Sequence, residues 1–426
     1  MSATVAIAGG GLAGLTAACH LAEAGVGVRL FERLDRVGGR VRTRQRDGFL
    51  LDRGFQVLFT AYPAVERELD LERLDLRRFD PGATIARPGR RSVLADPFRD
   101  PGALLASAFN REVTLADKLR TVRLRREALR DDPGAIETDA RSIREALLDR
   151  GFSDAFVDSF AAPFYGGITL DRPLADTSAF VFGYTFAMLS RGATAVPAAG
   201  MGAIPAQLAE RADSAGATIE TGQAVSGVSH PDRGDGVVLT LDGGTVTADV
   251  AIVATDPETA RDLTDVSSIP TDARACVTQY MALPGDTALD GTKRLVLNPT
   301  SEGPNTIAPL SAVAPEYAPK GQSLVSATYL GTPDVDDDAL AARTRETLEA
   351  WYPKRGFDGM ELLATDRIPF AQFDQPPGFR ETLPAVDAPD GAVFLAGDYT
   401  RWSSIQGAMA SGRDAADAVL DSLGRR

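Results

Sequence analysis

Two short apolar runs, separated by a glycine-rich turn and a run with helical spacing, open the chain. Residues 4–8 are apolar and partly β-branched, which is typical of a buried strand. A turn at 9–14 follows, and the apolar positions of 15–24 then recur at helical spacing up to a glycine. Residues 26–31 are again apolar and end at Glu32. This pattern predicts a strand, a helix and a second strand within about thirty residues.

Short strands and helices of the same kind return in the middle and at the end of the chain. A proline- and glycine-rich turn at 197–205 opens a predicted helix to Ala212, and Asp242-Gly243-Gly244 is a hairpin signal. The final block is a buried apolar run, a glycine-rich turn and a helical pattern. After the predicted helix that ends at Ala212, we predict six strands and one further helix. The strands are at 217–220, 223–228, 237–241, 245–248, 249–255 and 392–395, and the helix is at 413–420.

The two stretches between these blocks, 84–195 and 257–385, show other patterns. In the first, capping side chains predict two helices. In the second, the acidic run 334–338 precedes a predicted helix at 339–351, and we interpret the acids as a solvated helix entry rather than a metal site. The predicted caps are Thr114, for a helix to Arg130, and Ser142 with Glu145, for a helix that ends at Gly151.

An aromatic-rich segment follows the two capped helices. Its first four phenylalanines are spaced by four residues and would share one face of a helix, although Pro163 should disturb the end of that helix. Two interpretations stay open: a packed core, which we prefer, or the wall of an apolar substrate tunnel. The segment comprises Phe152, Phe156, Phe160, Phe164, Tyr165, Phe180, Phe182, Tyr184 and Phe186.

Composition narrows the chemistry that the chain can perform. Its 426 residues leave room for two lobes, and its formal charge of −14 argues against binding nucleic acid through bulk electrostatics. The two His and two Cys are each far apart in sequence, which excludes a His-rich zinc site and a disulfide framework. Neither His20 nor His230 has a setting that suggests a Ser-His-Asp hydrolase. We therefore expect a cofactor to carry the chemistry, and we expect no metal.

The first glycine turn has the spacing GxGxxG at the point where a strand passes into a helix. Gly9 suits a tight turn, Gly11 lets a pyrophosphate approach the backbone, and Gly14 lets the helix pack close to the sheet. Glu32 can accept hydrogen bonds from both ribose hydroxyls and disfavours a 2′-phosphate, so NADP is not expected. The alternative is that these glycines form a turn of some other α/β fold, but that interpretation does not explain why an acid, Glu32, ends the second strand.

Residues 36–43, Arg-Val-Gly-Gly-Arg-Val-Arg-Thr, come shortly after this acid. Here the sequence resembles the superfamily of flavin-dependent amine oxidases and phytoene desaturases. The resemblance implies that Arg40 and the backbone of the two preceding glycines pack against the pyrophosphate of FAD, and an Arg fork suits a diphosphate. It continues at Asp52-Arg53-Gly54-Phe55-Gln56, a turn that approaches the flavin in relatives.

The end of the chain resembles the second FAD motif of the same superfamily. This motif is Ala396-Gly397-Asp398-Tyr399-Thr400, and it continues through 404–412 into a helix. The resemblance implies that Asp398 meets the ribityl or phosphate region and that Gly407 and Ala408 allow close approach to the isoalloxazine ring. An enzyme that binds only NAD at its N-terminal motif does not need this C-terminal strand and helix. FAD is extended across the fold and needs both the N-terminal and the C-terminal motif.

The resemblance covers nearly the whole chain and implies an α/β fold. We expect a discontinuous Rossmann-like FAD-binding domain of the GR2 type, formed by 1–83, 196–256 and 386–426, and an α+β substrate-binding domain formed by 84–195 and 257–385. FAD is expected to be non-covalent, with Tyr399, Trp402 and Gln406 as flavin-side candidates and no catalytic residue assigned. The expected FAD-binding residues are Gly9, Gly11, Leu12, Ala13, Gly14, Glu32, Arg33, Gly38, Gly39, Arg40, Gly54, Phe55, Val225, Gly397, Asp398, Ile405, Gln406 and Ala408.

Three substrate classes fit hydride transfer to a flavin with little acid–base help. The C-terminal motif and the aromatic segment favour an apolar, isoprenoid- or carotenoid-like substrate, although the gap from Thr400 to Gly407 is shorter than in plant phytoene desaturases. An amine oxidase would use a flavin-side Lys, and Lys293 alone lies in a plausible region. A protoporphyrinogen oxidase would need cations such as Arg53 or Arg401 for propionates. A non-enzymatic binding module or chaperone is a fourth reading.

The chain shows no signal peptide and no apolar run suited to span a membrane. We expect a cytoplasmic protein with a small-molecule substrate, in which a peripheral membrane contact is compatible with the resemblance. The acidic balance and the preference for Arg over Lys fit either adaptation to a salty cytosol or an ordinary solvated surface. The sequence indicates no oligomeric state.

Overall fold

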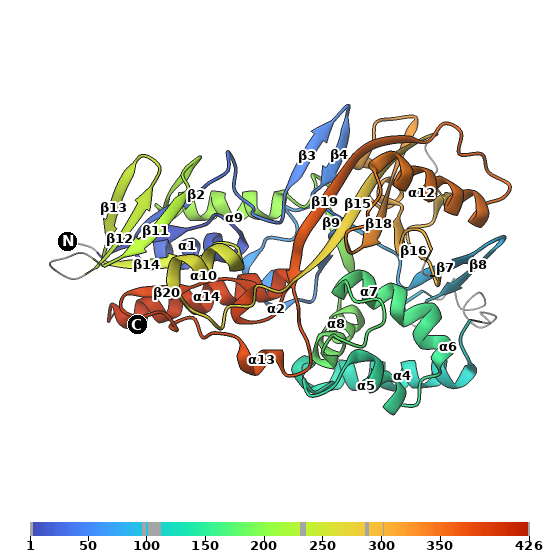
Figure 1. Ribbon diagram of the computed structural model, residues 1–426, viewed down its shortest axis with the longest axis horizontal. Helices are drawn as coiled ribbons and strands as arrows, with labels where there is room; N and C mark the ends of the chain where they lie inside the picture. Colours follow the sequence, from blue (N-terminus) through green and yellow to red (C-terminus); the bar gives the residue numbers. More distant parts are fainter. Residues whose placement is uncertain are drawn as a thin grey trace.

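The protein has two lobes that lie side by side along its longest axis (Figure 1). The structure is a computed structural model, and it describes residues 3–95, 99–100, 112–230, 236–285, 289–300 and 302–424. One lobe contains a parallel sheet with helices on one face, and the other contains a mixed sheet and a layer of helices (Figure 1). The expected α/β fold is thus confirmed.

A five-stranded parallel sheet in the order β10-β2-β1-β14-β20 is the centre of the first lobe. Its strands come from three parts of the chain, and β1 lies in the middle, with Ile7 beside Ile252 on one side and Leu30 on the other. β14 is buried along its whole length, as expected of a parallel strand covered on both faces. The strands are β1 (Thr4–Ala8), β2 (Gly27–Glu32), β10 (Thr218–Thr221), β14 (Val250–Val253) and β20 (Val393–Leu395).

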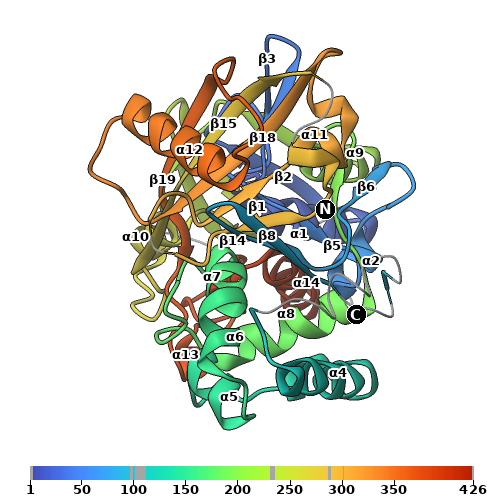
Figure 2. The same ribbon diagram turned by 90° about the vertical axis from the view of Figure 1, so that its right-hand side faces the viewer.

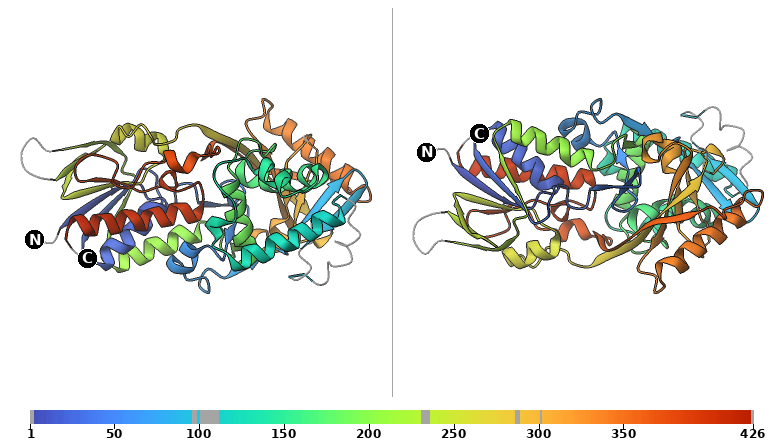
Figure 3. Two further views of the ribbon diagram at one scale, coloured as in Figure 1. Left: turned by 90° about the horizontal axis from the view of Figure 1, so that it is seen from below. Right: turned by 90° about the horizontal axis from the view of Figure 1, so that it is seen from above.

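Different layers cover the two faces of this sheet (Figure 3). On one face α1 (Leu12–Glu23) packs between α9 (Ala203–Ser214) and α14 (Ile405–Ser422). On the other face lies the antiparallel sheet β11-β12-β13, formed by Val225–Ser229, Val237–Leu241 and Gly244–Ala248. Successive side chains of β1 point to opposite faces of the sheet. Val5 and Ile7 pack into the hydrophobic core on the helix side, and Ala6 and Ala8 pack into the core on the other side.

Two helices begin earlier than their sequence pattern predicts. The first was expected from residue 15 and begins at Leu12, directly after the glycine turn. The last was expected from residue 413 and begins at Ile405, where the Ser404 side chain accepts a hydrogen bond from the Gly407 backbone N–H. Glycines inside both first turns obscured the helical pattern, because their low helix propensity is offset here by close packing against neighbouring backbone.

The second lobe is built on a seven-stranded mixed sheet in the order β19-β15-β18-β17-β16-β7-β8. Its longest strands, β15 and β19, run antiparallel and reach back toward the first lobe (Figure 1). α12 (Asp337–Trp351), capped by the Asp336 side chain, contacts this sheet, which confirms the solvated helix entry. The strands are β7 (Ala83–Arg87), β8 (Arg90–Leu94), β15 (Ala273–Pro284), β16 (Leu295–Leu297), β17 (Thr306–Ala308), β18 (Gln322–Leu330) and β19 (Glu361–Phe373).

A layer of helices lies beneath this sheet (Figure 2). Both predicted caps are present: Ser142 and Glu145 form the predicted capping box of α5, and Thr114 caps α4 in a second capping box with Asp117. The phenylalanines at 152–164 do not lie on one uniform helix, because a π-helical turn, Val157–Ala161, joins α6 to α7. Pro163 falls in the first turn of α7, where a backbone N–H is not needed, so the chain stays helical through it. The helices are α4 (Leu115–Arg130), α5 (Ile143–Asp149), α6 (Asp154–Phe156), α7 (Ala162–Thr169) and α8 (Ala179–Arg191).

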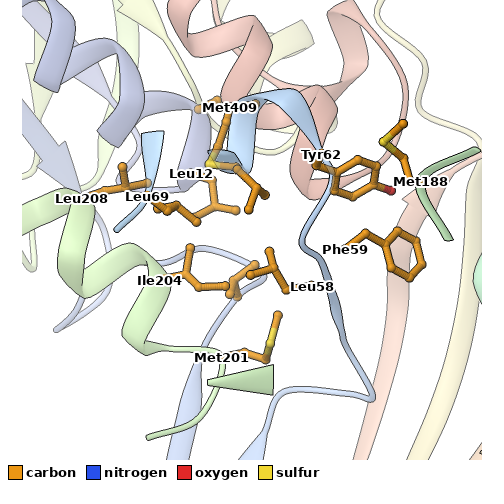
Figure 4. Close-up of a cluster of buried hydrophobic side chains, with 14 of the residues drawn as sticks. Leu12, Leu58, Phe59, Tyr62, Leu69, Met188, Met201, Ile204, Leu208 and Met409 are labelled. Carbon is orange, nitrogen blue, oxygen red and sulfur yellow. The ribbon is translucent and has the colours of Figure 1, made fainter. Parts of the chain in front are cut away.

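Short elements connect the two lobes. Figure 4 shows buried side chains where α1, α9 and α14 meet this region: Leu208 lies beside Leu69, and Leu12 and Met409 lie between them and Tyr62. The connecting elements are β3 (Thr43–Arg46), β4 (Phe49–Asp52), β5 (Leu58–Phe59), α2 (Pro63–Glu68), β6 (Leu76–Arg78), β9 (Thr194–Pro197), α10 (Pro257–Thr264), α11 (Leu310–Val313), the 3₁₀ turn Pro315–Tyr317 and α13 (Phe379–Thr382).

A buried carboxylate at the end of β4 binds donors from both lobes. Asp52 is 3% exposed, and it accepts hydrogen bonds from the Tyr317 hydroxyl at 2.9 Å and the Met201 backbone N–H at 2.9 Å. The Thr43 hydroxyl is a third donor to the carboxylate, and the Tyr280 hydroxyl donates to the Asp52 carbonyl. Burial raises the pKa of Asp52 above its ordinary value, and these donors oppose the rise.

Replacing Tyr317 with Phe should lower the free energy of unfolding by about 1–3 kcal/mol at neutral pH, because a buried carboxylate loses a donor. The folded pKa of Asp52 lies above its unfolded value, so this group's contribution to stability is lost as pH rises through the folded pKa. Loss of the donor raises that pKa further, so the cost of Y317F should shrink at acidic pH. Urea unfolding at several pH values measures this.

Tyr329→Phe is the matched control, because Tyr329 is also buried, in β18 of the seven-stranded sheet, and its hydroxyl contacts neutral groups, the Leu340 carbonyl and the Thr344 hydroxyl. Its cost should not depend on acidic pH. Equal pH profiles for the two variants would contradict the assigned role of Asp52.

Candidate FAD site

The two glycine turns of the N-terminal segment contact each other. The Gly38 backbone N–H donates to the Gly10 carbonyl at 2.8 Å, and a Cβ on Gly39 would lie 3.3 Å from the Cα of Gly11. Gly9 and Gly38 have φ angles of +109° and +122°, which disfavour any residue with a side chain. The structure therefore brings the GxGxxG turn and the GGR turn into one surface at the start of α1.

This helix start is suited to bind an anion. No side chain caps the N-terminus of α1, so the N–H groups of Leu12, Ala13 and Gly14 have no partner within the helix. A Cβ on Gly11 would meet nothing within 4 Å, whereas one on Gly14 would lie 2.1 Å from the Gly9 carbonyl oxygen. The predicted roles agree with this geometry: Gly11 faces open space, and Gly14 allows tight packing.

Glu32 ends β2 directly beside the first turn. It is 5% exposed, and its carboxylate accepts hydrogen bonds from the backbone N–H of Gly10 at 2.8 Å and of Leu34 at 3.0 Å. The Gln223 N–H donates to the Glu32 carbonyl, which brings the strand that begins at Val225 to the same edge. Arg33, in contrast, is exposed and pairs with Asp256 at 3.6 Å.

Arg40 connects the N-terminal motif to the C-terminal one. Its guanidinium donates to the Asp398 carboxylate at 2.6 Å, across 358 positions in sequence. Burial by itself lowers the pKa of Arg40, but the adjacent Asp398 outweighs that effect and raises it. The Ser403 hydroxyl also donates to Asp398, at 2.9 Å. These contacts fix both side chains where the two motifs meet.

The turn after Asp52 is held by the long strands of the second lobe. The Gly54 N–H donates to Asp366 of β19 at 3.1 Å, and the Phe55 N–H donates to the Thr278 hydroxyl of β15 at 3.4 Å. Next to this turn, Arg42 Nε and Gln56 Oε1 are buried and have no partner among the described residues. Sequence reasoning missed these anchors, because nothing in the sequence marks contacts over more than 200 positions.

The flavin-side candidates occupy three different environments. Tyr399 is fully buried and its hydroxyl donates to the Val253 carbonyl at 3.1 Å, so it supports the parallel sheet and is not available to a ligand. The Gln406 side-chain oxygen accepts the Ala64 N–H at 2.8 Å and thereby holds the start of α2. Trp402 packs against Tyr184 at 4.8 Å between ring centroids. Ile405 and Ala408, in the first turn of α14, are each partly exposed.

An apolar cavity of about 410 Å³ lies between the helical layer and the seven-stranded sheet. Phe55 and Val57, in the turn after Asp52 (here called the anchored turn), line one part of the cavity. Leu115 of α4, which is 72% exposed, lines another part, so the cavity reaches the surface. Both interpretations of the aromatic segment are therefore supported, because its side chains belong to the hydrophobic core and seven of them also line the cavity. These seven are Phe152, Phe156, Phe160, Phe164, Tyr165, Phe182 and Phe186.

The residues present fit FAD. The start of α1 offers N–H groups that can bind an anion, next to the open surface at Gly11. Glu32, at the end of β2, is a buried acid suited to ribose hydroxyls, and Arg40 pairs with Asp398 before α14. Within the described ranges, no group of His, Cys, Asp and Glu is arranged to hold a metal ion. The helices among these ranges are too short or too polar to cross a bilayer.

Comparison with known sequences places the chain in a family. Residues 12–420 match the sequence profile described as flavin containing amine oxidoreductase. A carotenoid 3,4-desaturase of Haloarcula japonica is 33% identical over 129 residues, 27% of this chain and 26% of the relative. A phytoene dehydrogenase of Streptomyces griseus is 30% identical over 250 residues, 52% and 48% of the two chains. The chain thus spans about half or less of these curated relatives.

Comparison with solved structures supports the fold. Cyclohexylamine oxidase from Brevibacterium oxydans matches with a TM-score of 0.69 at 17% identity, over 100% of both chains. Putrescine oxidase bound to putrescine matches with a TM-score of 0.71 at 17% identity, over 100% and 99% of the chains. A protein from Exiguobacterium, provisionally named protoporphyrinogen oxidase, matches with a TM-score of 0.71 at 17% identity, over 99% of both chains.

Gly11→Val tests the anion-binding turn. Gly11 has a φ of −75° and open space at its Cβ, so the variant should fold normally while its side chain blocks the approach of a pyrophosphate. We expect it to lose bound FAD, measured as flavin absorbance of the purified protein, with unchanged thermal unfolding of the flavin-free form. Gly243→Val is the control, because it also has open space but lies in a distant hairpin. Retention of FAD by G11V would refute the site.

Proposed function

Because the chain belongs to the family of flavin containing amine oxidoreductases, we propose that it is an FAD-dependent oxidoreductase that takes a hydride from an apolar, isoprenoid- or carotenoid-like substrate. The observation that carries the proposal is the aromatic-lined cavity, which extends from the surface to Phe55 and Val57 of the turn expected to face the flavin. The desaturase and dehydrogenase names of the curated relatives point to the same substrate class.

FAD would lie across the three segments that meet at the start of α1. The N–H groups of α1 would hold the pyrophosphate, Glu32 the ribose, and Arg40 with Asp398 the region between phosphate and flavin. The domains would then be 1–83, 196–256 and 386–426 for FAD and 84–195 and 257–385 for substrate. Cys19 and Cys276 are both buried, and burial raises their pKa values, so neither supplies a thiolate for a covalent flavin link.

When bound, the flavin supplies a hydride acceptor at N5. The protein would orient the substrate carbon chain and exclude water, and the phenylalanine wall is suited to both. Neither histidine lines the cavity, and Tyr165 is an unlikely proton acceptor because burial raises its pKa far above the ordinary value. The lining therefore suits abstraction of a hydride more than acid–base chemistry.

The alternative substrate classes have weaker support. For an amine oxidase, Lys293 is exposed and does not line the cavity, and Tyr399 is fully buried. For a protoporphyrinogen oxidase, Arg401 pairs with Asp414 outside the cavity, and Arg53 does not line it either. An apolar substrate would be stored in lipid, and we propose a cytoplasmic protein with a peripheral membrane contact.

Anaerobic reduction of the bound flavin separates these classes. The purified holoenzyme is mixed with polyprenoids in detergent, porphyrinogens and simple polyamines, and loss of flavin absorbance is followed. Polyprenoids should bleach the flavin. Rapid bleaching by polyamines alone would overturn the proposal in favour of amine oxidation, and no bleaching by any class would favour a binding module.

Val57→Trp should narrow the cavity beside the anchored turn. Val57 is only partly buried and lines the cavity, so the larger side chain should fill space that a long substrate needs. We expect KM for a polyprenoid to rise by about tenfold or more, because the narrowed cavity binds the long carbon chain less tightly, while flavin content stays unchanged. Thr194, which lines the same cavity, offers a milder comparison as Thr194→Val. An unchanged KM in V57W would place the substrate elsewhere.

A further inference from the structure

A second cavity lies beneath α12, on the opposite face of the seven-stranded sheet from the apolar cavity. Successive side chains of β17 separate the two: Thr306 lines the apolar cavity, whereas Ile307 packs into the hydrophobic core that contains α12. The second cavity has a volume of about 810 Å³, and the two cavities share no lining residue among those that the structure describes. We call it the polar cavity, and it lies between α12, the loop that joins β16 to β17, and Arg172.

The loop between β16 and β17 is folded around one buried side chain. Asn298 is 2% exposed, and its amide donates to the Pro304 carbonyl at 3.0 Å and accepts from the Thr300 backbone N–H at 3.0 Å. A Cβ on Gly303 would lie 2.6 Å from the Thr347 hydroxyl of α12, so the loop can lie this close to the helix because that position has no side chain. These contacts fix the loop as one wall of the polar cavity.

Arg172 follows α7, and its half-buried guanidinium binds neutral oxygens of this loop. It donates to the Asn305 side-chain oxygen at 2.7 Å, to the Asn298 carbonyl at 2.7 Å and to the Thr300 carbonyl. No carboxylate of the described residues forms an ion pair with it, and burial lowers the pKa of Arg172 because no nearby negative charge opposes the cost of desolvation. Three of its five N–H groups thus have acceptors, and two are left for a ligand.

One further arginine and two acids line the polar cavity nearer to solvent. Arg343 of α12 is exposed and, within the described ranges, has no ion pair. Glu302 of the loop and Glu346 of α12 are exposed as well. The chain has 59 acids against 45 basic residues, so a half-buried arginine without an acidic partner requires an explanation. The cavity therefore has a cation at its inner end and charges of both signs at its rim.

We propose that the polar cavity binds a small monocarboxylate that also carries a hydroxyl or amino group, with its carboxylate on Arg172. The planar guanidinium fits a carboxylate, and the half-buried charge gains the counter-ion that it lacks. The rim acids Glu302 and Glu346 repel a second negative charge, and they accept hydrogen bonds from the hydroxyl or amino group. A dianion is therefore a poorer ligand.

The site connects to the helical layer through one buried asparagine. Asn305 is 3% exposed, accepts from Arg172, and donates to the Pro163 carbonyl of α7 at 2.9 Å. A ligand that holds Arg172 in place would therefore also hold the contact between the sheet and α7. Because the ligand binds the native state, it should raise the midpoint of thermal unfolding.

Isothermal titration calorimetry of the holoenzyme tests the site, with lactate and serine as probes and malonate and inorganic phosphate as comparisons at equal ionic strength. Lactate and serine should bind, and malonate and phosphate should bind more weakly because the rim acids repel a second charge. Arg172→Gln should weaken lactate binding by about tenfold or more, since the charge-assisted hydrogen bonds are lost. Arg343→Gln, at the rim, should weaken it by a smaller factor.

Ala350→Phe keeps the test decisive even where Arg172→Gln does not fold. Ala350 is exposed on α12 and lines the polar cavity, so the larger side chain should block the ligand without changing any charge. Ala342→Phe, exposed on the same helix outside the cavity, and Arg126→Gln, exposed on α4, are the matched controls and should bind lactate like the wild type.

Three results would overturn the proposal. They are no binding of lactate or serine, binding of lactate that A350F leaves unchanged, and tighter binding of malonate or phosphate than of lactate. Neither Arg343 nor Ala350 lines the apolar cavity, so flavin content and flavin reduction should be unchanged in R343Q and A350F. The site therefore stands or falls independently of the proposed substrate.

Discussion

The buried carboxylate of Asp52 is the interaction on which the arrangement of the two lobes depends. It takes donors from the β3–β4 hairpin, from the turn before α9 and from Tyr317 in the 3₁₀ turn after α11. A carboxyl group at this depth is tolerated only when its hydrogen bonds are complete, so these segments must meet in one geometry. The turn that follows Asp52 carries Phe55 and Val57, and its position relative to α1 is fixed by the same contacts.

The candidate cofactor surface depends on this placement because it is assembled from distant parts of the chain. Two glycine turns contact each other at Gly38 and Gly10, and Arg40 reaches Asp398 across the fold. Each contact positions backbone or charge toward the start of α1, where the helix leaves N–H groups without partners. The aromatic segment has a double role on the other side of the anchored turn, since its side chains are largely buried and also enclose a cavity.

Local chemistry could be predicted from the sequence, and long-range placement could not. The glycine turns, Glu32, both capping boxes and most strands of the parallel sheet follow from short patterns. The early starts of α1 and α14 were missed because glycines hide helical periodicity. Tyr399 looked like a flavin neighbour from its place in the motif, yet the strand before it turns its ring into the sheet core. The seven-stranded sheet and the Asp366 anchor depend on pairings that leave no local signal.

The strand order of the parallel sheet has a consequence for biosynthesis. β1 and β2 leave the ribosome early, but β14, which pairs with β1, ends only at Val253, and β20, which pairs with β14, ends only at Leu395. The parallel sheet of the first lobe therefore cannot be completed until late in translation, and the apolar faces of its early strands stay exposed until β14 and β20 have been synthesised. Arg40 likewise gains its counter-ion only when Asp398 has emerged. Such a chain is expected to acquire its cofactor after release, and to need protection from aggregation until then.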